Sequence, residues 1–301
     1  MNTIQAAEIR YLDCGAGRLS YTVEGEGPLV VAVPGMGDLR STYRELAGPI
    51  VKAGFRLAVL DLRGHGSSNT TFRTHGDAAT GQDLLALIAK LGGPAVVVGN
   101  SMGASAAVWA AAESPEAVAG LVLLAPLLRE APRSRTSAWL TRQLYRAAFA
   151  RPWGAAFWSR YYASLNRGKR APWLAGHVAD IRRNLQEPGR LRSFRELAVQ
   201  LDHSLVEARL GEVTAPATIF VGSEDPDYKD PEAELAWFLE QLDATGQLIE
   251  GIGHYPQAQR PDLVVPVTLD FLASLQAPDG PRWARPAAGG SAQTGRSNLR
   301  G

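Results

Sequence analysis

The sequence predicts an α/β protein with a mostly parallel, doubly wound sheet and an inserted helical cap. Short apolar runs rich in Val, Leu and Ile alternate with helical segments along most of the 301 residues. This alternation is typical of a parallel sheet covered by helices on both faces. Glycine-rich segments follow several of these runs, at the strand ends where such sheets bind ligands. One long stretch without β-rich runs interrupts the alternation and is expected to form the cap.

The chain opens with a predicted hairpin. Polar and apolar residues alternate in 8–12 and 19–23, and a Gly-Ala-Gly turn separates the two runs. Continuous apolar runs follow, of the kind that is buried on both faces of a parallel sheet. The remaining core elements are expected in this order: strand 29–33, helix 41–53, strand 56–60, helix 80–91, strand 95–98, a helix that begins just after residue 101, strand 121–125, strand 217–221, helix 231–242, strand 246–250 and helix 261–275.

The stretch 129–209 is expected to form several short helices, divided at Pro152, Pro172 and Pro188. Because it leaves the sheet after one strand and returns before the next, it should lie over the carboxyl edge as a lid. Within 129–200, 14 arginines and one lysine stand against four acidic residues, a formal charge of +11 in a chain whose total is +1. This charge indicates either a solvated surface that pairs partly with the acidic body, or a mouth that attracts anionic substrates or an acidic partner.

These patterns divide the chain into a core formed by 1–127 and 211–276, a helical cap at 128–210 and a tail at 277–301. The tail is rich in Gly, Pro, Ser and Arg and is expected to be disordered. The tryptophans of the cap either pack its interior or line an aromatic acyl pocket. They are Trp139, Trp153, Trp158 and Trp173.

Composition argues against several classes of protein. The balance of 31 basic and 30 acidic residues argues against general nucleic-acid or membrane binding. The single cysteine, Cys14, rules out an internal disulfide and a thiolate metal cluster. We find neither a signal peptide nor an apolar stretch long enough to span a membrane, so we expect a cytoplasmic protein. Its expected partner is a small molecule, with no nucleic acid and no membrane, and a homodimer is compatible with the sequence.

The chain is organised around the segment 99–103, Gly-Asn-Ser-Met-Gly, which lies between a β-branched run and an Ala-rich helical run. A strand that turns directly into a helix holds the residue at its apex, Ser101, in a strained conformation with its side chain projecting outward. Gly99 and Gly103 let the strand and the helix approach each other closely. The first N–H groups of the helix then point at the space that the serine faces. This geometry favours a nucleophilic serine.

A serine hydroxyl needs a base, and the base needs an acid that fixes its tautomer. His254 follows the last strand in a glycine-flanked loop at the carboxyl edge, and we predict that it is the base. The acid should follow the preceding strand, where Asp225 is our choice ahead of Asp227 and then Glu224. A structural role or a place in a loop or in the lid is expected for the other histidines, which are His65, His75, His177 and His203.

Two backbone donors are expected to stabilise the negative charge that develops on the substrate. One is the N–H of Met102, directly after the nucleophile. The other should come from the Gly-rich segment 34–37, most plausibly the N–H of Met36, because glycine there lets the backbone approach a substrate closely.

Four motifs together resemble the α/β-hydrolase fold of the single-domain bacterial type with a helical cap, over roughly residues 8–276. The motifs are Gly-Asn-Ser-Met-Gly at 99–103, Asp-Leu-Arg-Gly-His-Gly-Ser-Ser at 61–68, Gly-Ser-Glu-Asp at 222–225 and Gly-Ile-Gly-His at 251–254. The resemblance implies a triad of Ser101, Asp225 and His254, with Met36 and Met102 as oxyanion donors. It implies no metal and no organic cofactor.

The leading functional hypothesis is a carboxylic ester hydrolase that works through an acyl-enzyme. Ser101 at the elbow argues against the dehalogenase and epoxide hydrolase branches, which use a carboxylate there. A C–C bond hydrolase of diketone-type ring-cleavage products is the first alternative, because Gly-Asn-Ser-Met-Gly resembles its elbow. The Gly-Pro-Gly loop of that subfamily is missing, Tyr255 replaces its Trp, and Pro34 stands where many family members have His. Amide, lactone or peracid chemistry, and a ligand-binding or signalling protein that keeps the pocket, are further alternatives.

Overall fold

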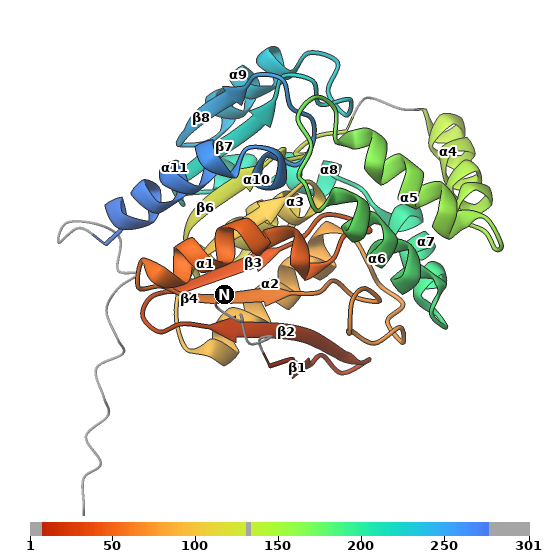
Figure 1. Ribbon diagram of the computed structural model, residues 1–301, viewed down its shortest axis with the longest axis horizontal. Coiled ribbons are helices and arrows are strands. Elements are labelled where there is room, and N and C mark those ends of the chain that lie inside the picture. The colour runs from red at the N-terminus through yellow and green to blue at the C-terminus, as the bar shows by residue number, and fades with distance from the viewer. Residues whose placement is uncertain (1–7, 131–133, 277–301) are drawn as a thin grey trace, which may run out of the picture.

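An eight-stranded sheet forms the centre of the structure, a computed structural model that describes residues 8–130 and 134–276 (Figure 1). The strand order is β1-β2-β4-β3-β5-β6-β7-β8. The pairs β1–β2 and β2–β4 are antiparallel and all other pairs are parallel. The strands are β1 Arg10–Asp13, β2 Arg18–Glu24, β3 Leu29–Val33, β4 Arg56–Leu60, β5 Ala95–Asn100, β6 Val118–Leu124, β7 Ala217–Gly222 and β8 Ala244–Ile249.

Helices cover both faces of this sheet, as the alternating pattern predicts. On one face, α1 and α11 pack against even-numbered side chains of β3 and β5, such as Val30 and Val96. On the other face, α2, α3 and α9 pack against odd-numbered side chains, such as Val31 and Val97. The helices of the core, with one 3-10 helix, are η1 Arg40–Tyr43, α1 Arg44–Lys52, α2 Asp77–Leu91, α3 Met102–Glu113, α9 Pro231–Gln241, α10 Pro256–Gln259 and α11 Pro261–Ser274.

The chain between β6 and β7, which we call the inserted segment, consists of helices joined by loops in its described residues. The predicted breaks at Pro152, Pro172 and Pro188 are confirmed, because each proline lies between two helices. The elements are α4 Arg135–Ala148, α5 Gly154–Leu165, α6 Leu174–Gln186, α7 Arg190–Gln200, α8 Ser204–Glu207 and the 3-10 helix η2 Leu210–Glu212. No helix in the described ranges is both long and apolar enough to cross a membrane.

The tryptophans of the inserted segment divide into two groups. Trp158 is buried in its apolar core, and Trp173 is partly buried against the same cluster. Trp139 and Trp153 are instead more than half exposed, so they pack no interior. The tail at 277–301, expected to be disordered, lies outside the described residues.

Candidate active site

The sharp turn expected at residue 101 is present between β5 and α3. Ser101 has φ 55° and ψ −126°, a left-handed conformation that L-residues rarely adopt. A Cβ on Gly99 would lie 2.5 Å from the Cα of Ala104, and one on Gly103 would lie 2.5 Å from the carbonyl oxygen of Val33. Both distances are too short for any real side chain, so this sequence pattern is what permits the turn.

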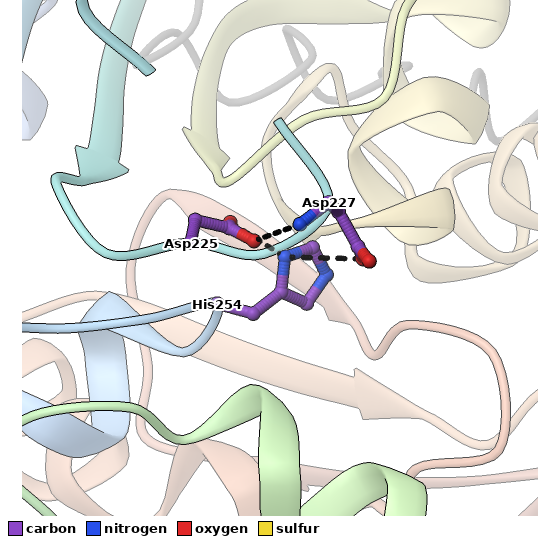
Figure 2. Close-up of side chains that lie close together, drawn as sticks. All are labelled: Asp225, Asp227 and His254. Carbon is purple, nitrogen blue, oxygen red and sulfur yellow. Dashed lines mark hydrogen bonds and ion pairs between the residues drawn. The ribbon is translucent and has the colours of Figure 1, made fainter. Parts of the chain in front are cut away.

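His254 and Asp225 come together at the carboxyl ends of the strands, in the loops that follow β8 and β7 (Figure 2). The Nδ1 of His254 lies 2.7 Å from Oδ2 of Asp225, and both side chains are buried. Asp227 is the second carboxylate, with its Oδ2 3.6 Å from the same nitrogen. Its backbone N–H donates to Asp225 Oδ1 at 3.0 Å. Glu224, the third candidate, is exposed, and its N–H bonds the carbonyl of Ile252.

Asn100 links the histidine loop to the elbow. Its side-chain amide donates to the carbonyl of His254 at 3.2 Å and to the carbonyl of Leu124 at 2.9 Å. Asn100 is fully buried and directly precedes Ser101. The sequence analysis gives Asn100 no role of its own. The polar side chain at the end of an apolar strand is the feature that could have identified it. It ties the backbone of His254 to the strand that carries the serine.

The remaining pair of the predicted triad is the serine and the histidine. Over the residues that the structure describes, no hydrogen bond joins the hydroxyl of Ser101 to His254. Such catalytic contacts commonly tighten only when substrate is bound. Because Nδ1 of His254 forms a hydrogen bond with Asp225, Nε2 is the ring nitrogen that remains to accept the proton of the Ser101 hydroxyl.

The charge state of His254 is set by opposing effects. Burial favours the neutral ring, but the negative charges of Asp225 and Asp227 outweigh it and raise the pKa of His254 to about 9. The carboxylates therefore stabilise an imidazolium strongly, which is the form that a general base adopts after it takes a proton.

The loop after β3 carries the expected donor Met36 and passes directly beside the serine, since a Cβ on Gly35 would lie 3.0 Å from the Cβ of Ser101. Neither the Met36 N–H nor the Met102 N–H donates a hydrogen bond to any residue in the described ranges. Met102 is the first residue of α3, where a backbone N–H has no partner within the helix. Both N–H groups are therefore uncommitted next to Ser101.

Gly37, the next residue of this loop, is held on both sides of its backbone. Its N–H donates to Nε2 of His65 at 3.2 Å, and its carbonyl accepts from the Trp158 indole at 3.0 Å. The Nδ1 of His65 lies 2.9 Å from the carbonyl of Arg63, which assigns the proton to Nδ1 and leaves Nε2 as the acceptor. Burial lowers the pKa of His65 to about 4, so the ring stays neutral.

Asp38 ends the loop and joins it to two helices of the inserted segment. Its buried carboxylate lies 2.6 Å from Nε2 of His177 in α6 and accepts from the hydroxyl of Tyr162 in α5 at 3.0 Å. The sequence places His177 in the predicted lid and indicates no partner for it. Its contact with Asp38 could not be read from the sequence, because 139 residues separate the two.

The described residues also contain a cluster of possible metal ligands and a cavity. Within the described part of the chain, Asp225, Asp227 and His254 are the one group of three acidic, His or Cys side chains whose ligand atoms lie within 4.8 Å of one another. In this group, however, Nδ1 of His254 already forms a hydrogen bond with Asp225. A cavity of about 330 Å³ lies between α4 and α7, and none of these three residues, nor Ser101, lines it.

Comparison with known proteins shows the family of the chain. The model of the alpha/beta hydrolase family matches residues 30–267. The chain is 28% identical over 284 residues to a 2-hydroxy-6-oxo-6-phenylhexa-2,4-dienoate hydrolase of Comamonas testosteroni, covering 90% of this chain and 96% of that protein. It is 31% identical over 224 residues to a pimeloyl-[acyl-carrier protein] methyl ester esterase of Chromobacterium violaceum, covering 72% of this chain and 83% of that protein.

Solved structures share the fold. A thermophilic esterase from Thermogutta terrifontis superposes with a TM-score of 0.72 at 23% identity, covering 89% of this chain and 99% of that one. An enol-lactonase from Burkholderia xenovorans superposes with a TM-score of 0.70 at 20% identity, covering 88% of this chain and 100% of that one. The region that the family model matches spans strands β3 to β8 except for Leu29, the first residue of β3. The chain therefore belongs to the alpha/beta hydrolase family.

Proposed function

We propose that this protein is a serine hydrolase that cleaves carboxylic esters through an acyl-enzyme intermediate. The observation that carries the proposal is the buried Asp225–His254 pair at 2.7 Å, tied by Asn100 to a strained Ser101. In this proposal Ser101 is the nucleophile, His254 the base and Asp225 the acid that orients it. Residues 128–210 form the cap over the site.

The proposed reaction has two halves. Ser101 Oγ attacks the ester carbonyl while Nε2 of His254 takes its proton, and the alcohol leaves with that proton. The N–H groups of Met36 and Met102 stabilise the oxyanion. Water then gives a proton to Nε2 of His254 and attacks the acyl carbonyl. The bond between this carbonyl and Ser101 Oγ breaks, Oγ takes the proton back from His254, and the acid is released. These steps use only side chains and backbone of this chain, on a small-molecule substrate in the cytoplasm.

Hydrolysis of a C–C bond in a diketone-type substrate is the second candidate. The specific observation in its favour is the set of relatives named as hydrolases of 2-hydroxy-6-oxo-dienoates, at 27–28% identity. Against it, Tyr255 follows His254 where that subfamily has Trp, and the 34–37 loop lacks its Gly-Pro-Gly. We therefore rank ester cleavage first.

Labelling with a fluorophosphonate tests the nucleophile before any substrate is known. Wild type should be labelled and Ser101→Ala should not, while Ser274→Ala, which removes an exposed serine on α11, should be labelled normally. A panel of p-nitrophenyl esters of increasing chain length and a vinylogous 1,5-diketone then separates the two reactions. Turnover of the diketone alone would overturn the ester proposal. Labelling without turnover faster than hours on any substrate would indicate a binding or signalling protein.

A further inference from the structure

Helix α4 and the start of α5 expose large apolar side chains to solvent. No residue of α4 is buried. Five apolar side chains here are between 48% and 64% exposed. Single apolar residues scattered on a surface are ordinary, but five in one short segment indicate an exposed patch. They are Trp139, Leu140, Leu144, Trp153 and Phe157.

These side chains belong to one protruding surface. Helix α4 stands at the outer edge of the molecule, away from the sheet, and packs against α7 (Figure 1). Leu140 and Leu144 are four residues apart and share one side of α4. The indole of Trp153 donates to the carbonyl of Ala147 at 2.9 Å, which places it over the C-terminal end of α4. The ring of Phe157 lies 5.9 Å from that of Phe149, which directly follows α4.

Unpaired positive charge surrounds the apolar side chains. Five exposed arginines occur on α4, on α5 and between them, and within the described ranges none makes an ion pair or a hydrogen bond. They are Arg135, Arg142, Arg146, Arg151 and Arg160. Elsewhere in the inserted segment several arginines do find acids, as Arg129 does with Glu234 and Arg209 with Glu113, whereas the exposed guanidinium groups of Arg167 and Arg182 bond no described residue. Five of these seven unpaired arginines therefore lie on this surface, which we call the α4–α5 surface.

We propose that the α4–α5 surface docks on an anionic lipid bilayer. Helix α4 exposes Leu140 and Leu144 on one side and Trp139 in the adjoining row with three arginines, an arrangement that fits the plane of the headgroups. Each basic side chain near an anionic leaflet contributes about 1 kcal/mol. The near-neutral total charge of the chain had argued against membrane contact, but that total conceals a +11 segment on an acidic body.

Other occupants fit less well. Two copies that met through this surface in a symmetric dimer would bring two sets of unpaired arginines together, and like charges repel. An acidic protein would satisfy the arginines, but it would need an apolar patch of its own to cover Leu140, Leu144 and Trp153. A bilayer offers both anionic headgroups and an acyl region, and its flat surface suits a protruding helix.

The surface also leads toward the candidate active site. Trp153, Phe157 and Tyr161 recur every four residues and so form one row along α5. The hydroxyl of Tyr161 donates to Asp227 at 3.1 Å, and Asp227 lies beside His254. On the proposed function, on which this one step rests, an amphiphilic ester passes from the bilayer along this row.

Flotation with lipid vesicles tests the docking directly. The full chain carrying Ser101→Ala is mixed with vesicles of phosphatidylcholine, alone or with about one quarter phosphatidylglycerol. We expect binding to the anionic vesicles only. Replacing Arg135, Arg142 and Arg146 together by Gln should weaken it at least about tenfold. The matched control replaces Arg10, Arg73 and Lys90, three exposed cations of the core, by Gln and should bind like the parent.

A second pair of variants separates lipid insertion from simple charge attraction. Leu140→Ser with Leu144→Ser should weaken vesicle binding, while Ile9→Ser with Leu263→Ser, which changes two exposed apolar residues of the core, should not. Equal binding by all variants, or no binding to anionic vesicles, would overturn the proposal. So would self-association through α4 that Leu140→Ser with Leu144→Ser abolishes, measured by light scattering without lipid. Because binding is measured on Ser101→Ala, its outcome does not depend on whether the chain is an esterase.

Discussion

Ser101 keeps a strained backbone conformation because its neighbours hold it there. Its N–H donates to the carbonyl of Leu124 at 2.9 Å, and its own carbonyl accepts from the N–H of Ala104 at 2.9 Å. Strain of this kind costs about 1–3 kcal/mol and persists only where the surroundings fix it. The packed glycines at 99 and 103 and these two hydrogen bonds supply that restraint, so the hydroxyl is presented before substrate arrives.

The pH dependence of catalysis should report the carboxylates beside His254. Only the neutral imidazole can take the serine proton, and the pKa of His254 is raised to about 9. We therefore expect kcat/KM to rise with pH and to level off above about 9. Asp227→Asn removes one of the two charges that raise this pKa, so the acid limb should move to lower pH. Asp225 still bonds Nδ1 in this variant, so the plateau should change little.

Glu224→Gln is the control for this pH profile. It removes an exposed carboxylate from the same loop, one that makes no contact with His254 in the described structure, and should leave the acid limb in place. Asp225→Asn should instead lower the plateau by about 10⁴, because the ring loses the acceptor that fixes its tautomer. An acid limb that Asp227→Asn leaves unmoved would contradict the assignment of the two carboxylates.

At the scale of elements, the loop after β3 is built jointly by the sheet and the inserted segment. His65 comes from the core, whereas Trp158, Tyr162 and His177 come from α5 and α6. All four side chains are buried. Helices α5 and α6 therefore position the backbone that carries the Met36 N–H, and they cannot move away without releasing it.

Tyr162→Phe tests this positioning with the smallest possible change. It removes the hydroxyl that donates to Asp38 and keeps the ring in place. If the loop then shifts, the Met36 N–H should stabilise the transition state less well, and kcat should fall about tenfold while KM changes little. The measurement is steady-state kinetics on a soluble p-nitrophenyl ester.

Tyr21→Phe is the matched control for that experiment. Tyr21 is also buried, but its hydroxyl makes no hydrogen bond to the residues that the structure describes. Its removal should leave kcat unchanged. If Tyr162→Phe raised KM and left kcat intact, the contact would shape the pocket and would not position the oxyanion donor.

Elements could be predicted where a local sequence pattern determines them, and were misplaced or missed where no such pattern exists. Strands β3 and β5 were predictable because each is a continuous apolar run, which stops at Pro34-Gly35 after β3 and at Gly99-Asn100 in β5. The start of α2 was placed three residues too late, since Gly76 with φ 101° ends the preceding loop in a way that composition does not reveal. The short helix α10 was missed, because four residues carry no periodicity.

The candidate site shows the same limit. Ser101, Asp225 and His254 were singled out because each follows a strand in a recognisable loop, and the structure brings Asp225 and His254 together. Asn100 and the Asp38–His177 contact were not predicted, because their meaning lies in partners more than 130 residues away. Local sequence thus indicated the candidate chemistry, and only the packing of the inserted segment revealed what holds it.

At the scale of the whole molecule, the inserted segment leaves and rejoins the core at one place. The N–H of His203, after α7, donates to Glu130, and the N–H of Glu130 in turn donates to Glu207, both at 3.4 Å. Nδ1 of His203 lies 2.8 Å from Oδ2 of Asp77, the first residue of α2. Both side chains are buried, so this pair fastens the base of the inserted segment to the core.

The His203–Asp77 pair should make the stability of the fold depend on pH. Burial favours the neutral ring, but the charge of Asp77 outweighs it and raises the pKa of His203 above its usual 6.5. A histidine whose pKa is higher in the folded state than in the unfolded state stabilises the fold. This stabilisation is complete at pH values below the unfolded-state pKa and is lost as the pH rises through the folded-state pKa. His203→Asn should therefore lower the free energy of unfolding by about 3 kcal/mol at acidic pH, and by less as the pH rises above about 6.5.

Urea unfolding of wild type and variant at several pH values between about 6 and 9 measures this difference. His75→Asn is the matched control, because His75 is also buried but its pKa is lowered to about 4. His75 is therefore neutral throughout the upper part of that range, so the cost of its replacement should stay constant above about pH 7. If the cost of His203→Asn were equally flat, His203 would be neutral in the folded protein. The base of the inserted segment would then be held by packing and neutral hydrogen bonds alone.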